Sequence, residues 1–109
     1  MKINGAQAII MAAEMAASAD HSWTTGVAAR NRFGRHVELF GPDARKFCQG
    51  GARVLFGYDA TDQERRRAGD AVQAAASELY GRLPTGVNDY VGREATLKML
   101  ARAFELAAT

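Results

Sequence analysis

Residues 61–81 read TDQERRRAGDAVQAAASELYG, and this stretch decides the fold class. Thr61 and Glu64 have the spacing of a capping box, in which the threonine hydroxyl accepts from the third helical N–H and the glutamate reaches back. Gly81 supplies a C-terminal stop. Apolar residues recur between them at helical spacing and predict one buried stripe: Ala68, Val72, Ala75 and Leu79. The stretch therefore predicts a long helix packed against other helices.

Two outer segments repeat the helical pattern. Asn4 can cap a first helix that runs to about Ser18, with a face of Ala6, Ile9, Ile10, Ala13 and Ala17. A last helix is expected after Gly92-Arg93. Its apolar residues form two stripes, which predicts burial on a wide arc: Leu97, Leu100, Ala101 and Phe104, then Met99, Ala103 and Leu106.

A further helix is predicted to start at Gly41-Pro42-Asp43, because proline fits a first turn and aspartate suits the positive end of the helix dipole. One face would carry Ala44, Phe47, Cys48, Gly51 and Leu55, and Gly57 would end the helix. Gly50-Gly51 inside it costs about 1 kcal/mol per residue relative to alanine. A helix tolerates that cost where another backbone must approach closely.

Residues 23–40 do not fit a helix. Residues 27–30 and 35–39 flank Asn31-Arg32-Phe33-Gly34, and the second segment alternates apolar and polar residues. This pattern predicts a two-stranded β-hairpin with a four-residue loop. The expected fold is mainly α: about four packed helices in a single compact domain over residues 1–109, with the hairpin inserted at about 23–40.

Composition excludes several classes of protein. The 109 residues hold 14 basic and 12 acidic side chains, and the net charge of +2 makes nucleic acid an unlikely partner. A single cysteine can form neither an internal disulfide nor a structural zinc site. The longest apolar-rich stretch, residues 6–19, contains Glu14 and is short of a membrane span. We expect a cytoplasmic bacterial protein with no metal, cofactor or membrane partner.

A basic and aromatic cluster is the first candidate site. No acidic residue occurs between His21 and Val37, and the cluster comprises Trp23, Arg30, Arg32, Phe33 and Arg35. Guanidinium groups beside an exposed aromatic ring suit an acidic protein surface or a nucleotide. The alternative is a solvated turn with both aromatic rings in the core.

Asn88, Asp89 and Arg93 form the second candidate site. An amide, a carboxylate and a guanidinium can together bind a small polar ligand. The structural alternative is that Asn88 or Asp89 caps the last helix while Arg93 pairs with a carboxylate.

Two other groups have simpler explanations. Cys48 with His21 or His36 could act as a nucleophile, but its expected place is mid-helix on the apolar face, as a small buried hydrophobe. The run Arg65-Arg66-Arg67 has acidic residues within helical reach, so a solvated, ion-paired face is expected.

The ordered motifs resemble a family of small uncharacterised bacterial and phage proteins. They are Trp23-x-x-Gly26-x-x-Ala29-Arg30, Gly34-Arg35, Pro42-Asp43-Ala44, Phe47-Cys48-x-x-Gly51-Ala52 and Asn88-Asp89-x-x-Gly92-Arg93, and they span most of the chain. The chain departs from the pattern at Val87, where a tryptophan is usual. The resemblance implies a compact domain in a bacterial or phage setting and no particular activity.

We therefore expect a non-enzymatic interaction protein of phage or prophage origin, such as an inhibitor of a host defence complex, that binds a host protein through the hairpin. One alternative is a protein that binds or sequesters a small polar or nucleotide-like ligand. Another is a small enzyme that uses Cys48 or Asp89. Pairing of two copies through an Ala/Gly helix face is also open.

Overall fold

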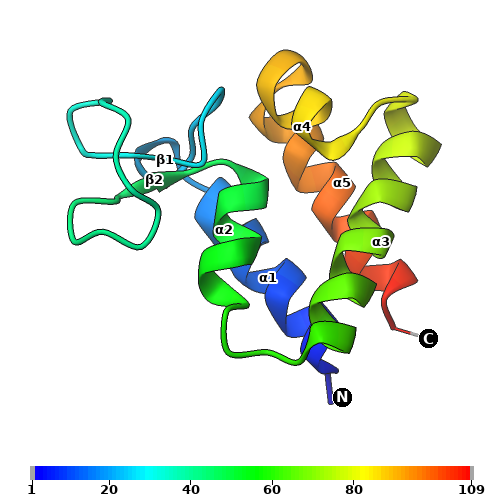
Figure 1. Cartoon of the computed structure of the whole chain (residues 1–109). Coiled ribbons are helices and arrows are strands. Elements are labelled where there is room, and N and C mark those ends of the chain that lie inside the picture. Colours follow the sequence, from blue (N-terminus) through cyan, green and yellow to red (C-terminus); the bar gives the residue numbers. More distant parts are fainter. Residues whose placement is uncertain (1, 109) are drawn as a thin grey trace.

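The computed structural model describes residues 2–108, and Figure 1 shows their arrangement. The elements in chain order are α1 (Gly5–Ala17), the 3₁₀ turn η1 (Asp20–Ser22), β1 (Ala29–Arg30), β2 (Lys46–Phe47), α2 (Gln49–Phe56), α3 (Asp62–Tyr80), α4 (Pro84–Gly86), the π-helical turn η2 (Val87–Val91) and α5 (Arg93–Leu106). The protein is mainly α, with one small two-stranded sheet between α1 and α2, as the sequence predicts.

The core lies among the helices. α1 contacts α2, α3 and α5, and α3 packs along α5 (Figure 1). Most core residues are alanines, which allow helix axes to approach closely, and a few larger side chains fill the space between them. The fully buried larger apolar side chains are Ile10, Val72, Val87, Met99 and Leu100.

Local capping signals place the ends of the long helices. Thr61 and Glu64 form the predicted capping box, and Gly81 ends α3 in the left-handed conformation at φ 61°. Asn4 caps α1, and its Nδ2 also donates to the carbonyl of Ala107 beyond α5. The side chain of Asn4 thereby fixes the start of the first helix against the end of the last.

The predicted helix faces need two corrections. Leu79 is 44 % exposed, and Ala76 rather than Leu79 completes the buried stripe of α3. In α5, Ala101 is exposed, whereas Thr96 is buried and its hydroxyl donates to the carbonyl of Gly92 at 2.8 Å. The threonine belongs to the core because a backbone carbonyl accepts from its hydroxyl.

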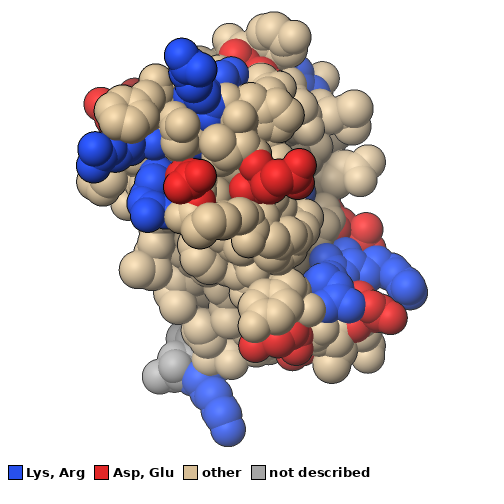
Figure 2. Space-filling model, turned by 60° about the vertical axis from the view of Figure 1, so that its left-hand side comes forward, with Lys and Arg blue, Asp and Glu red and all other residues tan. Residues whose placement is uncertain are grey.

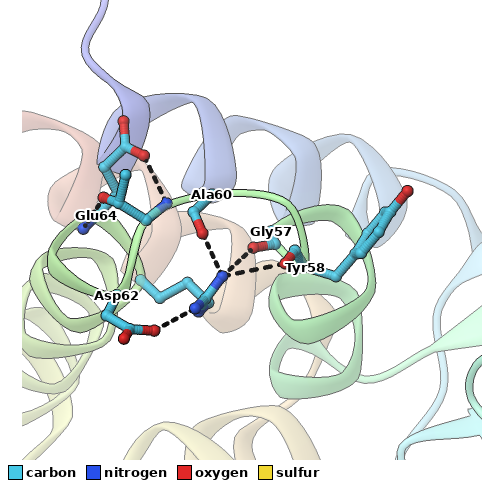
Figure 3. A network of polar contacts seen from close by, with 7 residues as sticks. Gly57, Tyr58, Ala60, Asp62 and Glu64 are labelled. Carbon is cyan, nitrogen blue, oxygen red and sulfur yellow. Dashed lines mark hydrogen bonds and ion pairs between the residues drawn. The ribbon is translucent and has the colours of Figure 1, made fainter.

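The connection between α2 and α3 is closed by Arg65 (Figure 3). Its guanidinium donates to the carbonyls of Gly57 and Tyr58 at 3.3 and 3.1 Å, to that of Ala60, and to the carboxylate of Asp62. The ion pair with Asp62 confirms the expected local pairing for Arg65, whereas Arg66 and Arg67 form no ion pair within residues 2–108. Arg65 also satisfies carbonyl oxygens that follow the C-terminus of α2.

The second strand of the sheet is not where the sequence pattern puts it. Ala29 and Arg30 pair antiparallel with Phe47 and Lys46, rather than with residues 35–39. Only a single bridge, between Arg30 and His36, remains of the expected hairpin, although the tight turn at Asn31–Gly34 is present. The partner strand lies far along the chain, beyond the reach of a local pattern.

The same pairing moves the start of α2. Residues 45–48 hydrogen-bond to the backbone of residues 24–30, so they are extended and α2 begins at Gln49 instead of Gly41. Cys48 is therefore its N-cap rather than a residue in its middle. Gly57 ends α2, as predicted.

Gly51 confirms the expected close approach of two backbones. A Cβ at this position would lie 2.3 Å from the carbonyl oxygen of Ala28. A Cβ at Gly50 would meet nothing nearer than Cys48 Sγ at 3.9 Å. The two adjacent glycines therefore have different roles: Gly51 lets the strand region pack on α2, and Gly50 leaves an open space.

Candidate functional site

Asn88 is the centre of a buried polar network. Its Oδ1 accepts from Trp23 Nε1 at 2.9 Å and from the backbone N–H of Gln49 at 3.0 Å. Its Nδ2 donates to the carbonyl of Thr24 at 3.0 Å and to Asp89 Oδ1 at 2.9 Å. One amide thus uses both donors and both acceptor positions while being only 1 % exposed.

This arrangement corrects the expected capping role. Gly92, not Asn88 or Asp89, is the N-cap of α5, and Asn88 lies in the π-helical turn η2. The N–H of Gly92 donates to Val87 O at 3.0 Å, which closes the wider turn and directs Asn88 inward. Asn88 satisfies the first N–H of α2 instead, from a distant part of the chain.

Asp89 lies beside this network at the edge of a cavity of about 420 Å³. Its Oδ1 also accepts from the N–H of Gly26 at 3.0 Å, which fixes the carboxylate against the segment before β1. We call this space the α2 cavity. Its lining residues are Gly26, Val27, Ala28, Leu39, Cys48, Gln49, Gly50, Gly51, Arg53, Val54, Thr85, Asn88 and Asp89.

Cys48 lines the α2 cavity and is half-buried, which corrects its expected place on an apolar helix face. Its Sγ accepts from the N–H of Gly51 at 3.2 Å as the cap of α2. Both histidines, His21 and His36, are exposed, and neither lines the cavity. The structure therefore does not assemble the Cys/His pair considered from the sequence.

Arg53 is the cationic group of the cavity lining. Its Nε donates to Gln49 Oε1 at 3.0 Å, and no carboxylate among residues 2–108 forms an ion pair with it. Burial lowers the pKa of Arg53, and the nearby Cys48 acts in the opposite direction. The guanidinium is thus a partly desolvated charge without a counter-ion among the described residues.

Arg30 and Arg93 have structural partners at separate places. Arg30 donates to Thr24 Oγ1 and to the carbonyls of Thr25 and Gly34, so it holds the loop before β1 against the turn after it. Arg93 pairs with Asp20 at 3.0 Å and donates to the carbonyl of Ser18, joining α5 to the end of α1. Neither side chain lines the α2 cavity.

The remaining predicted residues lie on an exposed loop. The guanidinium of Arg32 lies 4.8 Å from the centre of the Phe33 ring, and Phe33 is 75 % exposed. Arg32 and Phe33 share a hollow of about 250 Å³ with Asn31, Asp43 and Arg45. Arg35 is exposed as well.

The structure therefore divides the predicted site residues into two groups. Asn88 and Asp89 line the α2 cavity, and Trp23 donates to Asn88; Arg32, Phe33 and Arg35 lie on the exposed loop. Arg30 and Arg93 belong to neither group. Sequence reasoning missed Arg53 and Thr85, because their place depends on the true start of α2 and on the turn η2. In the sequence, only the paired glycines Gly50 and Gly51 indicated that space is open beside the start of α2.

No group of three or more histidine, cysteine, aspartate or glutamate side chains within residues 2–108 is arranged to hold a metal ion. In the same part of the chain, no helix combines the length and apolar character needed to cross a membrane. No protein-family model, curated protein or solved structure matches this chain.

Proposed function

We propose that the protein is a small interaction protein that binds an acidic surface of a partner protein through residues 31–46, here called the docking loop. The observation that carries this proposal is the exposed pair of Arg32 and Phe33, whose stacked side chains border a hollow shared with Arg45. Aromatic and arginine side chains contribute most of the binding energy at many protein interfaces. Phe40, 62 % exposed, adds a second aromatic ring to the same loop.

Charge supports this choice of partner. The docking loop holds four basic and two acidic residues, so its net charge of +2 equals that of the whole chain, and the rest of the molecule is neutral. Figure 2 brings the loop side forward and shows several basic side chains in the upper part of this face, with acidic side chains among and below them. A basic patch on a neutral body attracts and orients an acidic protein surface.

A protein partner fits the loop better than a nucleic acid. Asp43 lines the same hollow as Arg32 and Arg45, and Glu38 lies elsewhere in the loop. Carboxylates placed among the arginines repel a phosphate backbone, whereas a protein surface can offer donors to them. The net charge is also small for binding that depends on the number of phosphates neutralised.

The more specific interpretation, a phage or prophage protein that inhibits a host defence complex, remains a prediction within this proposal. It requires that the docking loop occupies an acidic site on a host protein. A cytoplasmic partner is part of the same prediction.

The test compares two variants with the same change in charge. Arg32→Glu/Arg35→Glu reverses two charges on the docking loop, and Arg66→Glu/Arg82→Glu reverses two exposed arginines on the helical body. Tagged protein is cross-linked in lysate of the bacterial host, and cross-linked peptides are identified by mass spectrometry. We expect a partner whose cross-links join the docking loop to an acidic segment, lost in the loop variant and kept in the control.

Two results would contradict the proposal. One is a partner that binds the loop variant as well as it binds the wild type, with cross-links elsewhere. The other is nucleic acid that co-purifies with the wild type and dissociates steeply with salt.

A further inference from the structure

We propose that the α2 cavity is a second binding site, for a small aliphatic zwitterion. This site goes beyond the docking function, since only Leu39 of its lining belongs to the docking loop. The cavity combines the volume of a small-molecule site with apolar lining residues and two charged side chains, those of Arg53 and Asp89.

The cavity has the volume of a small-molecule site. Pockets of roughly 300–1,000 Å³ typically hold such ligands, and about 420 Å³ falls in this range. Its apolar lining residues include Val27, Leu39 and Val54. Gly50 keeps it open, because a side chain there would enter space that no atom nearer than Cys48 Sγ fills. An aliphatic group of a ligand can fill the same space.

Arg53 provides the first charged contact. Its guanidinium is partly desolvated, and the only hydrogen bond of this group to residues 2–108 is the one from Nε to Gln49. Its Nη1 lies beside α3, 3.5 Å from where a Cβ of Gly69 would be. The two terminal nitrogens of the guanidinium therefore have donors to spare. A ligand carboxylate would neutralise this charge and accept from these nitrogens, which is the pairing that guanidinium geometry favours.

Asp89 provides the second charged contact. Its Oδ1 is used by the N–H of Gly26 and by Asn88 Nδ2, whereas Oδ2 has no partner among the described residues. These two hydrogen bonds hold the carboxylate at the rim with one oxygen free. A ligand ammonium group can donate to that oxygen.

Both charged groups lie near the first turn of α2. Asn88 joins Asp89 to the N–H of Gln49, so Asp89 lies at the start of this helix. Arg53 lies one turn further, and its Nε donates back to Gln49 Oε1 at 3.0 Å. A small ligand that carries both an ammonium and a carboxylate group can therefore contact both side chains.

The lining also excludes the nucleotide-like ligand considered from the sequence. No aromatic side chain lines the α2 cavity, so nothing there can stack on a base. The carboxylate of Asp89 would also repel a phosphate group.

The test is an NMR titration of the ¹⁵N-labelled full chain with three probes: the dipeptide Ala-Leu, its N-acetyl form and its C-terminal amide. We expect Ala-Leu to shift the amide signals of Gly26 and Gly50. Each capped probe lacks one charge and should bind at least about tenfold more weakly, as loss of a charged hydrogen bond implies.

Two variants assign each charge to its residue. Asp89→Asn should remove the preference for Ala-Leu over the N-acetyl probe and keep the preference over the amide. Arg53→Met should do the reverse, and Arg53→Lys should retain binding of the carboxylate.

Gly50→Leu tests the cavity without changing either charged residue. It should abolish binding of Ala-Leu, whereas Ala74→Leu, on an exposed position of α3, should leave binding unchanged. The proposal is overturned if Ala-Leu causes no shifts at millimolar concentration, if the capped probes bind equally well, or if Gly50→Leu binds like the wild type. None of these outcomes bears on the docking loop.

Discussion

The helical body and the segment of residues 23–48 are stabilised by different kinds of contact. In the body, α1, α3 and α5 bury a continuous apolar core of alanines and a few larger side chains. The segment 23–48 has only two short strands and few core residues, and polar contacts hold it: Arg30 within the loop, and Asn88 and Asp89 from η2. Both candidate sites lie on or beside this segment.

The difference shows where single side chains matter most. Most core residues of the body are alanines, so few of its side chains are large enough for their truncation to cost much. A polar network concentrates stability in a few groups, because each buried group left without a partner costs about 1–3 kcal/mol of unfolding free energy. We therefore expect the strongest single effects at the boundary between the two regions, and smaller ones inside the body.

The largest effect is expected from Asn88→Ala. This change leaves the indole N–H of Trp23, the N–H of Gln49 and the carbonyl of Thr24 without their partner, and we expect the free energy of unfolding to fall by about 3–5 kcal/mol. Urea denaturation followed by circular dichroism measures it. Tyr90→Ala, at an 81 % exposed neighbour in η2, is the control and should change stability by less than about 0.5 kcal/mol. A loss below about 1 kcal/mol for Asn88→Ala would mean that the network does not hold the segment.

The two glycines of α2 should respond in opposite directions. Gly51→Ala places a methyl group against the Ala28 carbonyl, and we expect a loss of about 2–3 kcal/mol as the backbones separate. Gly50→Ala meets open space and should stabilise the helix by about 0.5–1 kcal/mol. Thermal unfolding of both variants checks the pair. Equal effects would show that the strand region does not pack on α2 as described.

Inside the body, the capping box of α3 should have a moderate effect. Thr61→Ala removes the hydroxyl that accepts from Glu64 N–H, and we expect a loss of about 1 kcal/mol. Thr61→Ser keeps the acceptor and serves as the control in the same denaturation series. If both variants lost the same stability, the hydroxyl would not be the cause.

The smallest effect should come from two exposed carboxylates, and it depends on pH. Hydrogen bonds from the backbone and hydroxyl of Thr61 lower the pKa of Glu64, and a hydrogen bond from Arg102 lowers that of Glu78. A lowered pKa contributes stability above the ordinary value of 4.5, and this contribution is lost as the pH falls through the folded-state value.

Glu64→Gln/Glu78→Gln should therefore lower the stability slightly at neutral pH and leave it nearly unchanged at acid pH, so that the stability curve falls less steeply on acidification. Denaturation between pH 3 and 7 measures it. An unchanged acid slope in the double variant would show that these carboxylates do not cause the dependence.

The contrast between the regions also explains what the sequence could predict. The long helices are specified by local signals, such as the capping boxes at Asn4 and Thr61, and their predicted ends agree with the structure. The second strand and the start of α2 were predicted wrongly, because both depend on pairing between residues about 17 positions apart. Pro42 and Asp43 carried a local helix-start signal that tertiary pairing overrode.

The candidate sites follow the same rule. Asn88 and Asp89 were recognised as a polar pair, but their partners in α2 and the segment 23–48 depend on the three-dimensional arrangement. The exposed Phe33 beside Arg32 could be predicted, because a tight turn places its residues at the surface. Arg53 could not, since the pattern placed α2 eight residues too early.

The most direct test of the central claim is hydrogen exchange of the indole N–H of Trp23, the single tryptophan of the chain. Asn88 joins the segment 23–48 to the helical body through this group and the carbonyl of Thr24. We predict that the indole N–H of Trp23 exchanges about as slowly as core amides of α3 and α5, and that Asn88→Ala removes this protection. Rapid exchange in the wild type, at the rate of a free indole, would contradict it.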